Sequence, residues 1–222
     1  MITLKNIKKT YGDRTVLDIE NLTFSKGETI AIVGPNGSGK STLLKIIADT
    51  VKSDGGDIER NGKILYLPQQ SVPFRKSVRK NILFSMENTD NKDKRCDEIL
   101  EELSLTSLAD KNAKTLSGGE AQRLSLGRIL VNEGDFLLLD EPSSAADIEG
   151  TETIEKALAR YREKTGCGVI MTTHSPVQAL KLSDRIIMLC DGKIVEDGKP
   201  EELLHSPKTE WGKKFISMWV LG

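Results

Sequence analysis

The stretch "GPNGSGKS", Gly34–Ser41, decides the fold. It matches the pattern G-x-x-x-x-G-K-[ST], in which a glycine-rich loop turns its backbone N–H groups inward around the phosphates of a nucleotide. The helix that follows adds the positive end of its dipole. We expect Lys40 to reach the β- and γ-phosphates and Ser41 to ligate Mg²⁺. The stretch therefore predicts a site for a nucleoside triphosphate.

The residues on both sides of this loop supply the context that such a site requires. The run "ETIAIVG", residues 28–34, is almost continuously apolar, which is typical of a strand buried on both faces of a parallel sheet. In "KSTLLKIIADT", residues 40–50, the side chains of Leu43, Leu44 and Ile47 fall on one stripe of a helix. A strand, a phosphate loop and a helix in this order make a chance match improbable.

Further along the chain, strand patterns alternate with helix patterns. Buried strands are predicted within residues 63–70, 136–142 and 168–175, and a hairpin is predicted within 184–198, with Asp191-Gly192 as its tight turn. Helices are predicted around 96–103 and 154–161, and after Ser175, which is placed to cap a helix beginning at Pro176. This alternation indicates an α/β domain with a mostly parallel sheet. Residues 72–130 break it, and we expect an inserted helical subdomain there.

Length and composition narrow the class of protein. The 222 residues suffice for one domain with a substantial core, and the net charge of -1 gives no sign of nucleic-acid binding. The three cysteines show no disulfide or metal-ligand spacing, which fits a reducing compartment and small core residues. We expect no signal peptide at the N-terminus, and no apolar run approaches the roughly 18 residues of a membrane helix.

Two adjacent carboxylates, Asp140 and Glu141, end the apolar run "FLLLDEP". In open parallel sheets, ligands bind beyond the carboxyl ends of the strands, so both acids are placed to face the phosphate loop. Asp140 suits the Mg²⁺ shell, and Glu141 suits a base that orients the attacking water. The alternative for this pair is a surface turn after a strand.

A second glycine loop lies in "TLSGGEAQR", residues 115–123, ahead of a predicted helix. Ser117, Gly118 and Gly119 are suited to hold an anion at the N-terminus of that helix. Because one nucleotide has a single γ-phosphate, which Gly34–Ser41 already holds, we expect the second loop to serve the nucleotide of a second copy under two-fold symmetry. The alternative is an ordinary helix cap with close packing.

With these motifs in order, the chain resembles the nucleotide-binding domains of ABC ATPases over essentially all 222 residues. The resemblance implies a P-loop NTPase core with a mostly parallel sheet, an N-terminal antiparallel β subdomain and a helical subdomain at about 72–130. It implies that ATP is bound by Tyr11, Gly34, Pro35, Asn36, Gly37, Ser38, Gly39, Lys40, Ser41 and Thr42. It also implies catalysis by Glu141, His174 and Gln69, and Mg²⁺ binding by Ser41, Gln69 and Asp140. For Tyr11, the alternative to stacking on adenine is that it caps a hairpin.

The resemblance extends to two loops that meet the partner. Ser117, Gly118, Gly119 and Glu120 match the signature loop that acts on the partner's nucleotide, and Ser144 to Asp147 match the D-loop. Glu120 replaces the usual glutamine, whose loss we expect to be tolerated, and Ala146 replaces the usual leucine, which we expect to loosen dimer packing. The interval from Lys40 to Gln69 is short for the family, so we expect a trimmed antiparallel subdomain.

The resemblance implies an ATPase that is bound peripherally at the cytoplasmic face of a membrane. We expect ATP and Mg²⁺ as cofactors, transmembrane permease subunits and a second ATPase subunit (a homodimer) as partners, a solute-binding protein as a further candidate, and no nucleic acid. The leading interpretation is a prokaryotic importer of a small solute. A separate-subunit exporter or a soluble assembly factor stays open, whereas a small P-loop kinase would lack the second glycine loop. His205 is expected to be exposed, and the basic segment 74–80 is either a partner surface or a solvated face.

Overall fold

The computed structural model describes residues 1–87 and 91–220. The N-terminal region forms a three-stranded sheet in the order β2-β1-β4, with both pairs antiparallel. Its strands are β1 (Ile2–Tyr11), β2 (Arg14–Phe24) and β4 (Gly55–Arg60). Ile2, Leu4 and Ile7 of β1 are fully buried, and the alternation shifts by one residue between Leu4 and Ile7, where Asn6 has φ 53° and the register with β4 is irregular.

The central sheet has six strands in the order β5-β6-β7-β3-β8-β9. Its strands are β3 (Thr29–Val33), β5 (Ile64–Leu67), β6 (Phe136–Asp140), β7 (Gly168–Thr172), β8 (Arg185–Cys190) and β9 (Lys193–Gly198). Neighbours pair in parallel except β8 and β9, which form the predicted hairpin. Both turn residues have positive φ, 45° at Asp191 and 77° at Gly192, as a two-residue turn of type I′ requires.

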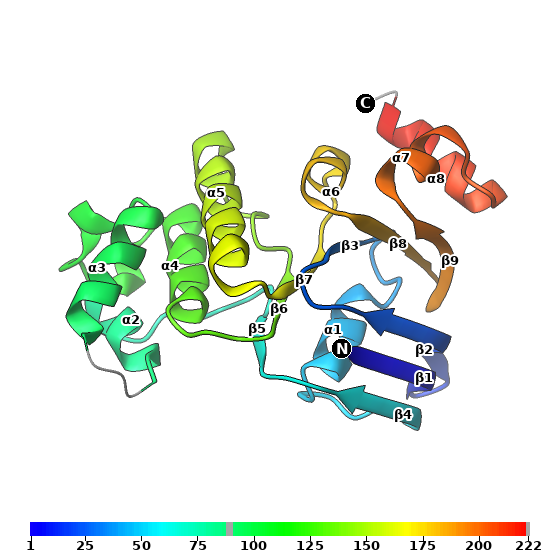
Figure 1. Ribbon diagram of the computed structural model, residues 1–222, viewed down its shortest axis with the longest axis horizontal. Helices are drawn as coiled ribbons and strands as arrows, with labels where there is room; N and C mark the ends of the chain where they lie inside the picture. Colours follow the sequence, from blue (N-terminus) through cyan, green and yellow to red (C-terminus); the bar gives the residue numbers. More distant parts are fainter. Residues whose placement is uncertain (88–90, 221–222) are drawn as a thin grey trace.

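Helices cover this sheet and extend beyond it (Figure 1). They are α1 (Lys40–Ile47), α2 (Val78–Ser85), α3 (Lys92–Glu102), α4 (Gly118–Leu130), α5 (Ile148–Thr165), α6 (Pro176–Leu182), α7 (Pro200–His205) and α8 (Glu210–Val220). Short 3₁₀ turns lie at Thr106–Leu108 and Ala113–Thr115. Helices α2, α3 and α4 gather at one end of the molecule, and α7 and α8 lie at the other end beside β9.

Two apolar clusters fill the interior, one on each face of the central sheet. Alternate residues of each strand serve opposite clusters, so Ile30 and Ile32 pack with the N-terminal sheet, while Ala31 and Val33 pack with the helices. The two faces of the sheet are therefore both dry, which explains why its strands read as continuous apolar runs. Helix α1 lies between the two sheets (Figure 1), so Ile46 is buried as well as the predicted stripe.

The described part of residues 72–130 contains helices and one isolated bridge, between Ser77 and Asn112, but no strand. In the short interval between Lys40 and Gln69, the chain contributes β4, the third strand of the N-terminal sheet. Cys96 and Cys167 are buried and Cys190 is half-buried, all with free thiols, and His205 is exposed as predicted.

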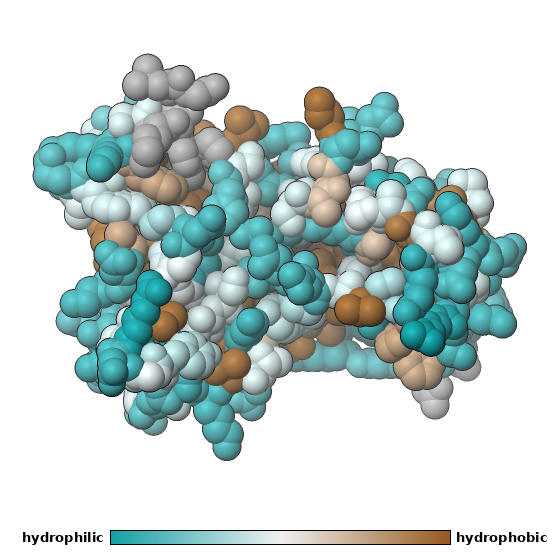
Figure 2. Space-filling view, turned by 180° about the vertical axis from the view of Figure 1, so that it is seen from behind, coloured by the Kyte–Doolittle hydropathy of each residue, from teal (hydrophilic) through white to brown (hydrophobic). Residues whose placement is uncertain are grey.

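Across residues 1–87 and 91–220, no helix combines the length and the apolar character needed to span a bilayer. On the face shown in Figure 2, hydrophobic side chains form small separate patches among hydrophilic ones.

Candidate active site

The phosphate loop follows β3 and leads into α1, and two of its glycines are fixed by close approach of the backbone. Gly34 has φ 152°, and a Cβ there would lie 2.0 Å from the carbonyl oxygen of Leu189. Gly39 has φ 107°, and a Cβ there would lie 2.7 Å from the carbonyl oxygen of Val16. Any side chain at either position would push the loop away from β8 or β2. The loop is thus wedged between the two sheets.

Lys40 is buried at the start of α1 and closes the loop on itself. Its ammonium donates hydrogen bonds to the carbonyl oxygens of Gly34, at 2.9 Å, and Pro35, at 3.0 Å. Burial lowers the pKa of Lys40, and the negative charges of Glu141 and Asp140 partly oppose that shift. The charged amine is thereby held beside the loop and close to the two carboxylates.

Ser41, in the first turn of α1, and Asp140, at the end of β6, lie in contact, as expected from their positions in the sequence. The Ser41 hydroxyl donates to Oδ1 of Asp140 at 3.0 Å, and the Thr172 hydroxyl donates to the same oxygen at 2.7 Å. Thr172 ends β7, which pairs in parallel with β6, and its register places it opposite Asp140. Asp140 is 2% exposed, so its carboxylate is held by these bonds in a nearly dry environment.

Glu141 adopts the left-handed backbone conformation, with φ 53°, which a non-glycine residue seldom adopts. Its N–H donates to the Thr172 hydroxyl at 3.0 Å. Its two carboxylate oxygens are both engaged: Oε2 accepts from Nε2 of Gln69 at 2.8 Å, and Oε1 lies 2.6 Å from Nε2 of His174. The turn in the backbone thus aims Glu141 at the two residues predicted to act with it.

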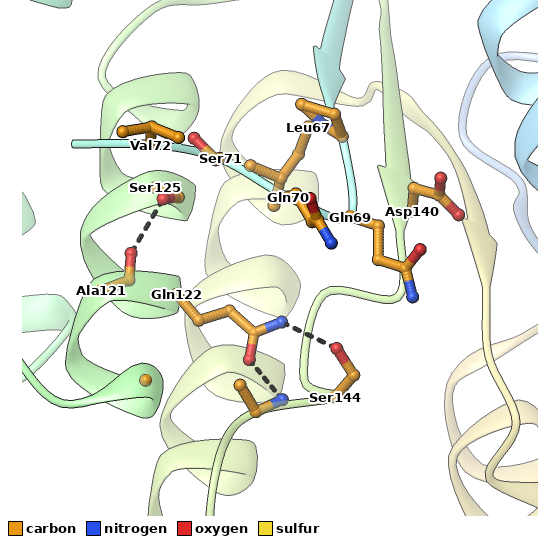
Figure 3. A pocket seen from close by; sticks show the side chains of 13 residues that line it. Leu67, Gln69, Gln70, Ser71, Val72, Ala121, Gln122, Ser125, Asp140 and Ser144 are labelled. Carbon is orange, nitrogen blue, oxygen red and sulfur yellow. Dashed lines mark hydrogen bonds between the residues drawn. The ribbon is translucent and has the colours of Figure 1, made fainter.

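Gln122, on α4, ties the second glycine loop to the loop after Glu141. Its Nε2 donates to the carbonyl oxygen of Glu141 at 2.9 Å, and its Oε1 accepts from the N–H of Ala145 at 2.9 Å. Figure 3 shows Gln122 and its hydrogen bond to Ser144 at one wall of a cavity of about 230 Å³, with Gln69 and Asp140 at the opposite wall. The cavity joins α4 to the end of β6 within one chain.

The second glycine loop begins α4 with a reciprocal cap. The Ser117 hydroxyl accepts from the N–H of Glu120 at 3.3 Å, and the Glu120 carboxylate accepts from the N–H of Ser117 at 2.7 Å. That N–H holds the pKa of Glu120 below its ordinary value of 4.5. The carboxylate that replaces the usual glutamine is therefore turned back onto its own helix terminus.

Tyr11 ends β1 with a side chain that is 52% exposed. The ammonium of Lys9 lies 5.3 Å from the centre of its ring and forms an ion pair with Asp54 at 2.7 Å. A cation held close to the ring polarises the aromatic face. The arrangement leaves much of the tyrosine accessible to a stacking partner.

The structure thus brings together Gly34–Ser41, Asp140, Glu141, Gln69 and His174. Gly118 lines the cavity that Gln69 and Asp140 also line, but no residue of the phosphate loop lines it. Two residues of the site were missed from the sequence, Thr172 and Gln122. The only sequence signal for Gln122 is its position four residues after Gly118, on the same side of a helix. Ser144 is exposed and accepts a weaker hydrogen bond from Gln122, while Asp147 caps α5 through the N–H of Gly150.

Comparison with known proteins agrees with this geometry. The family described as ABC transporter matches residues 17–144. The tungstate uptake system ATP-binding protein TupC of Peptoclostridium acidaminophilum is 39% identical over 207 residues, covering 88% of this chain and 97% of that protein. The spermidine/putrescine import ATP-binding protein PotA of Mannheimia succiniciproducens is 34% identical over 232 residues, and the chain spans 62% of its length.

A solved structure gives the same result at the level of the fold. The ATP-binding cassette MJ0796, in a dimeric post-hydrolysis state bound to ADP and phosphate, superposes with a TM-score of 0.82 at 30% identity. The match covers 90% of this chain and 99% of the cassette. The chain therefore belongs to the ABC transporter family, as an ATP-binding subunit that hydrolyses ATP to ADP and phosphate.

Proposed function

We propose that this ATPase is the energy-coupling subunit of a membrane importer for a small solute, bound peripherally at the cytoplasmic face. In this proposal residues 1–222 form one ABC-type ATP-binding domain, with 72–130 as its helical subdomain. The names of its relatives support an importer, since they describe uptake of tungstate, of spermidine and putrescine, of phosphate and of maltose. Transmembrane permease subunits would then be its partners, and a solute-binding protein would deliver the solute to them.

The observation that carries the proposal is the hydrogen bond between Gln69 and Glu141. Gln69 begins a segment whose apolar side chains face solvent: Val72 is 75% exposed and Phe84 is 68% exposed. Exposed apolar groups of this size indicate a surface that a partner covers. A partner docked there would sense, through Gln69, whether Glu141 is engaged in hydrolysis.

The residues near Asp140 fit a bound Mg²⁺. Ser41, Asp140 and Gln69 offer hydroxyl, carboxylate and amide oxygens, which are the donors that Mg²⁺ prefers when phosphate oxygens complete its shell. Groups of three or more ionisable ligands are absent from the described residues, so phosphates are needed to complete such a site. When bound, the ion would neutralise charge developing on the transferring phosphoryl group.

The chain's own residues divide the work of hydrolysis. Lys40 is proposed to leave the carbonyl oxygens of Gly34 and Pro35 and bind the β- and γ-phosphates. Glu141 accepts a hydrogen bond from the attacking water and aligns it, because its carboxylate is fixed between Gln69 and His174. His174, with a side chain that is 44% exposed, contacts Glu141 and is proposed to contact the γ-phosphate as well.

The signature loop, Ser117 to Glu120, is proposed to complete the site of a second copy. Within one chain the glycines of the loop pack beside Ala145, whereas Ser117 is exposed, so its side chain is available to a partner's nucleotide. The solved relative MJ0796 is a dimer with ADP and phosphate bound. Two copies facing each other under two-fold symmetry would bury two nucleotides between them. Hydrolysis would then allow the two copies to separate.

An oxyanion is the first solute class to test. The relative named for tungstate uptake aligns over nearly its whole length, and another is named for phosphate import. Since no residue described above selects a transported solute, the choice would be made by the permease and binding protein. The transported solute would be identified by comparing the uptake of tungstate and of phosphate in cells that carry the wild-type protein or the Glu141→Gln variant.

Cross-linking tests the importer proposal directly. Cysteines placed singly at Val72 and Phe84 should capture a polytopic membrane protein in native membranes, whereas Glu59→Cys, on the exposed side of β4, should capture none. Capture of soluble proteins alone would favour an assembly factor. Capture of a membrane protein without any ATP-dependent uptake, but with ATP-dependent efflux, would favour the exporter.

A further inference from the structure

We propose that helix α8 forms a docking pocket for the segment Ile148–Glu149 of a second copy of this chain. The inference rests on the proposed two-fold dimer and adds to it a contact made by the C-terminal helix. It concerns a cavity of about 420 Å³ that lies beside the phosphate loop. Its walls are Gly34, Pro35, Asn36, His174, Trp211, Lys214 and Phe215.

The C-terminal helix is anchored firmly enough to shape this cavity. The buried carboxylate of Glu196, on β9, accepts hydrogen bonds from the N–H and hydroxyl of Thr209, just ahead of α8. Gly212 packs so closely on Glu196 that a Cβ there would lie 2.7 Å from its Oε1. Ile216 is 6% exposed and joins the main core. The helix is therefore held on β9 along its inner face.

Next to this inner face, α8 carries two half-buried aromatic rings, which also pack on the main core, and an exposed lysine. The rings of Trp211 and Phe215 stack with their centres 4.8 Å apart and their planes at 17°. Lys214 lies between them in sequence, and its side chain faces solvent. The described residues offer this ammonium no ion pair, while the neighbouring Lys213 is paired with Glu210. The pocket is thus suited to an apolar side chain followed by a carboxylate.

The chain presents such a pair at the start of α5. Ile148 is 89% exposed, more than any other large hydrophobic residue in the described part of the chain. Glu149 follows it in the first helical turn, exposed, and within residues 1–87 and 91–220 its carboxylate has no ion-pair partner. Asp147 fixes the start of the helix by accepting from the N–H of Gly150 at 2.8 Å. The pair is therefore displayed on a rigid terminus.

Position on the molecule favours a second copy as the source. His174 lines the α8 pocket and also a second cavity, of about 410 Å³, which includes Glu141, Ser144 and Thr151 near the start of α5. Thr151 and Glu155 of α5 line that second cavity, so the α8 pocket and the first turns of α5 both border His174. Neither Ile148 nor Glu149 lines the α8 pocket of its own chain. A two-fold axis would let each copy insert its segment into the other's pocket.

The expected contacts are apolar and ionic. Ile148 of one copy would bury its side chain against Trp211, Phe215 and Pro35 of the other, and Glu149 would pair with Lys214. Burial of the aliphatic side chain would supply most of the stabilisation, because an ion pair at a solvent-exposed rim contributes little. Because Asn36 and His174 share the pocket wall, occupation by the partner would be felt at the nucleotide site.

Cross-linking between copies tests the proposal. Two preparations of Glu141→Gln protein, one with Ile148→Cys and the other with Phe215→Cys, are mixed with ATP and Mg²⁺ and treated with a short bismaleimide. In the mixture we expect a covalent dimer whose yield falls at least tenfold when ATP is omitted. A mixture in which Glu59→Cys replaces Phe215→Cys serves as the control and should remain uncross-linked.

A charge exchange gives an independent measurement that needs no added cysteine. Lys214→Glu and Glu149→Lys should each weaken the ATP-dependent dimer about two- to fivefold in sedimentation experiments, and the double variant should recover most of the loss. Both residues are exposed, and circular dichroism checks that the variants fold. A dimer that forms normally with no cross-link and no charge effect overturns this inference and leaves the proposed function standing. A protein that stays monomeric with ATP under every condition overturns both.

Discussion

The hydroxyl of Thr172 donates a hydrogen bond to Oδ1 of Asp140 at 2.7 Å across the β6–β7 pair. The same hydroxyl oxygen accepts from the N–H of Glu141 at 3.0 Å. One threonine therefore fixes the carboxylate proposed for Mg²⁺ and the backbone of the residue proposed to orient water. Its position at the end of a central strand makes this bridge rigid.

Replacing Thr172 by valine should remove the hydroxyl that bridges Asp140 and Glu141 while keeping the shape of the side chain. The change leaves the N–H of Glu141 without its partner and removes one of the two hydrogen bonds that Oδ1 of Asp140 accepts, which should cost about 1–3 kcal/mol of unfolding free energy. Loss of a residue that positions a metal ligand should lower kcat about 10- to 100-fold. Thr165→Val, which removes a helical hydroxyl far from the site, is the control. A Thr172→Val enzyme with wild-type kcat would show that the bridge has no role in turnover.

Ser117→Arg should separate nucleotide binding from hydrolysis. The phosphate loop of the same chain is untouched, so the Kd for ATP should change little, while hydrolysis should collapse because the partner's γ-phosphate loses its contact. Mixing this variant with Lys40→Ala should restore activity, since one complete site can form in each mixed dimer. Normal hydrolysis by Ser117→Arg alone would contradict the composite site.

Tyr11→Ala should weaken ATP binding through loss of base stacking, which is worth about 1–3 kcal/mol, and thus raise the Kd on the order of tenfold. Tyr11→Phe keeps the ring over Lys9 and should bind like wild type. Binding titrations with ATP and with inorganic triphosphate distinguish the outcomes, because only ATP has the base. If Tyr11→Ala lowers Tm and leaves the Kd for ATP unchanged, the residue is a hairpin cap instead.

Glu120→Gln should reveal a pH-dependent contribution to stability. A carboxyl whose pKa is lowered by folding stabilises the native state above its unfolded pKa, and that stabilisation is lost as pH falls through the lower folded pKa. The difference in unfolding free energy between wild type and Glu120→Gln should therefore be constant from neutral pH to about pH 5, and should shrink below the ordinary value of 4.5. Denaturant titrations at several pH values measure it. A difference that grows toward acid would show that the Ser117 N–H is not the cause of the shift.

The sequence predicted the parts of this structure that local chemistry determines. A strand that is apolar at every position must be dry on both faces, so β3, β6 and β7 were identifiable as a parallel sheet. The phosphate loop requires glycine where the backbone passes within contact of Leu189. The turn at Asp191-Gly192 likewise needs two residues that tolerate positive φ.

Features that depend on which strands become neighbours were not predictable in this way. Thr172 belongs to the site only because β7 lies beside β6, and Gln122 only because α4 packs against the loop after Glu141. The left-handed conformation of Glu141 has no signal in its residue type. The cavity between α8 and the phosphate loop is lined by residues far apart in sequence. The roles assigned to the site residues remain predictions.

Glu141→Gln tests the central claim that this carboxylate drives hydrolysis and so ends the closed state of two copies. The substitution keeps the shape of the side chain, and an amide oxygen can still accept the hydrogen bond from Gln69. The carboxylate that acts as the base is lost. The measurement is turnover together with gel filtration in ATP and Mg²⁺, with Asp140→Asn alongside. We predict turnover reduced by at least a hundredfold and a stable dimer for Glu141→Gln, and weakened Mg²⁺-dependent ATP binding with no dimer for Asp140→Asn. Wild-type turnover by Glu141→Gln would contradict the account and leave His174 as the residue to examine.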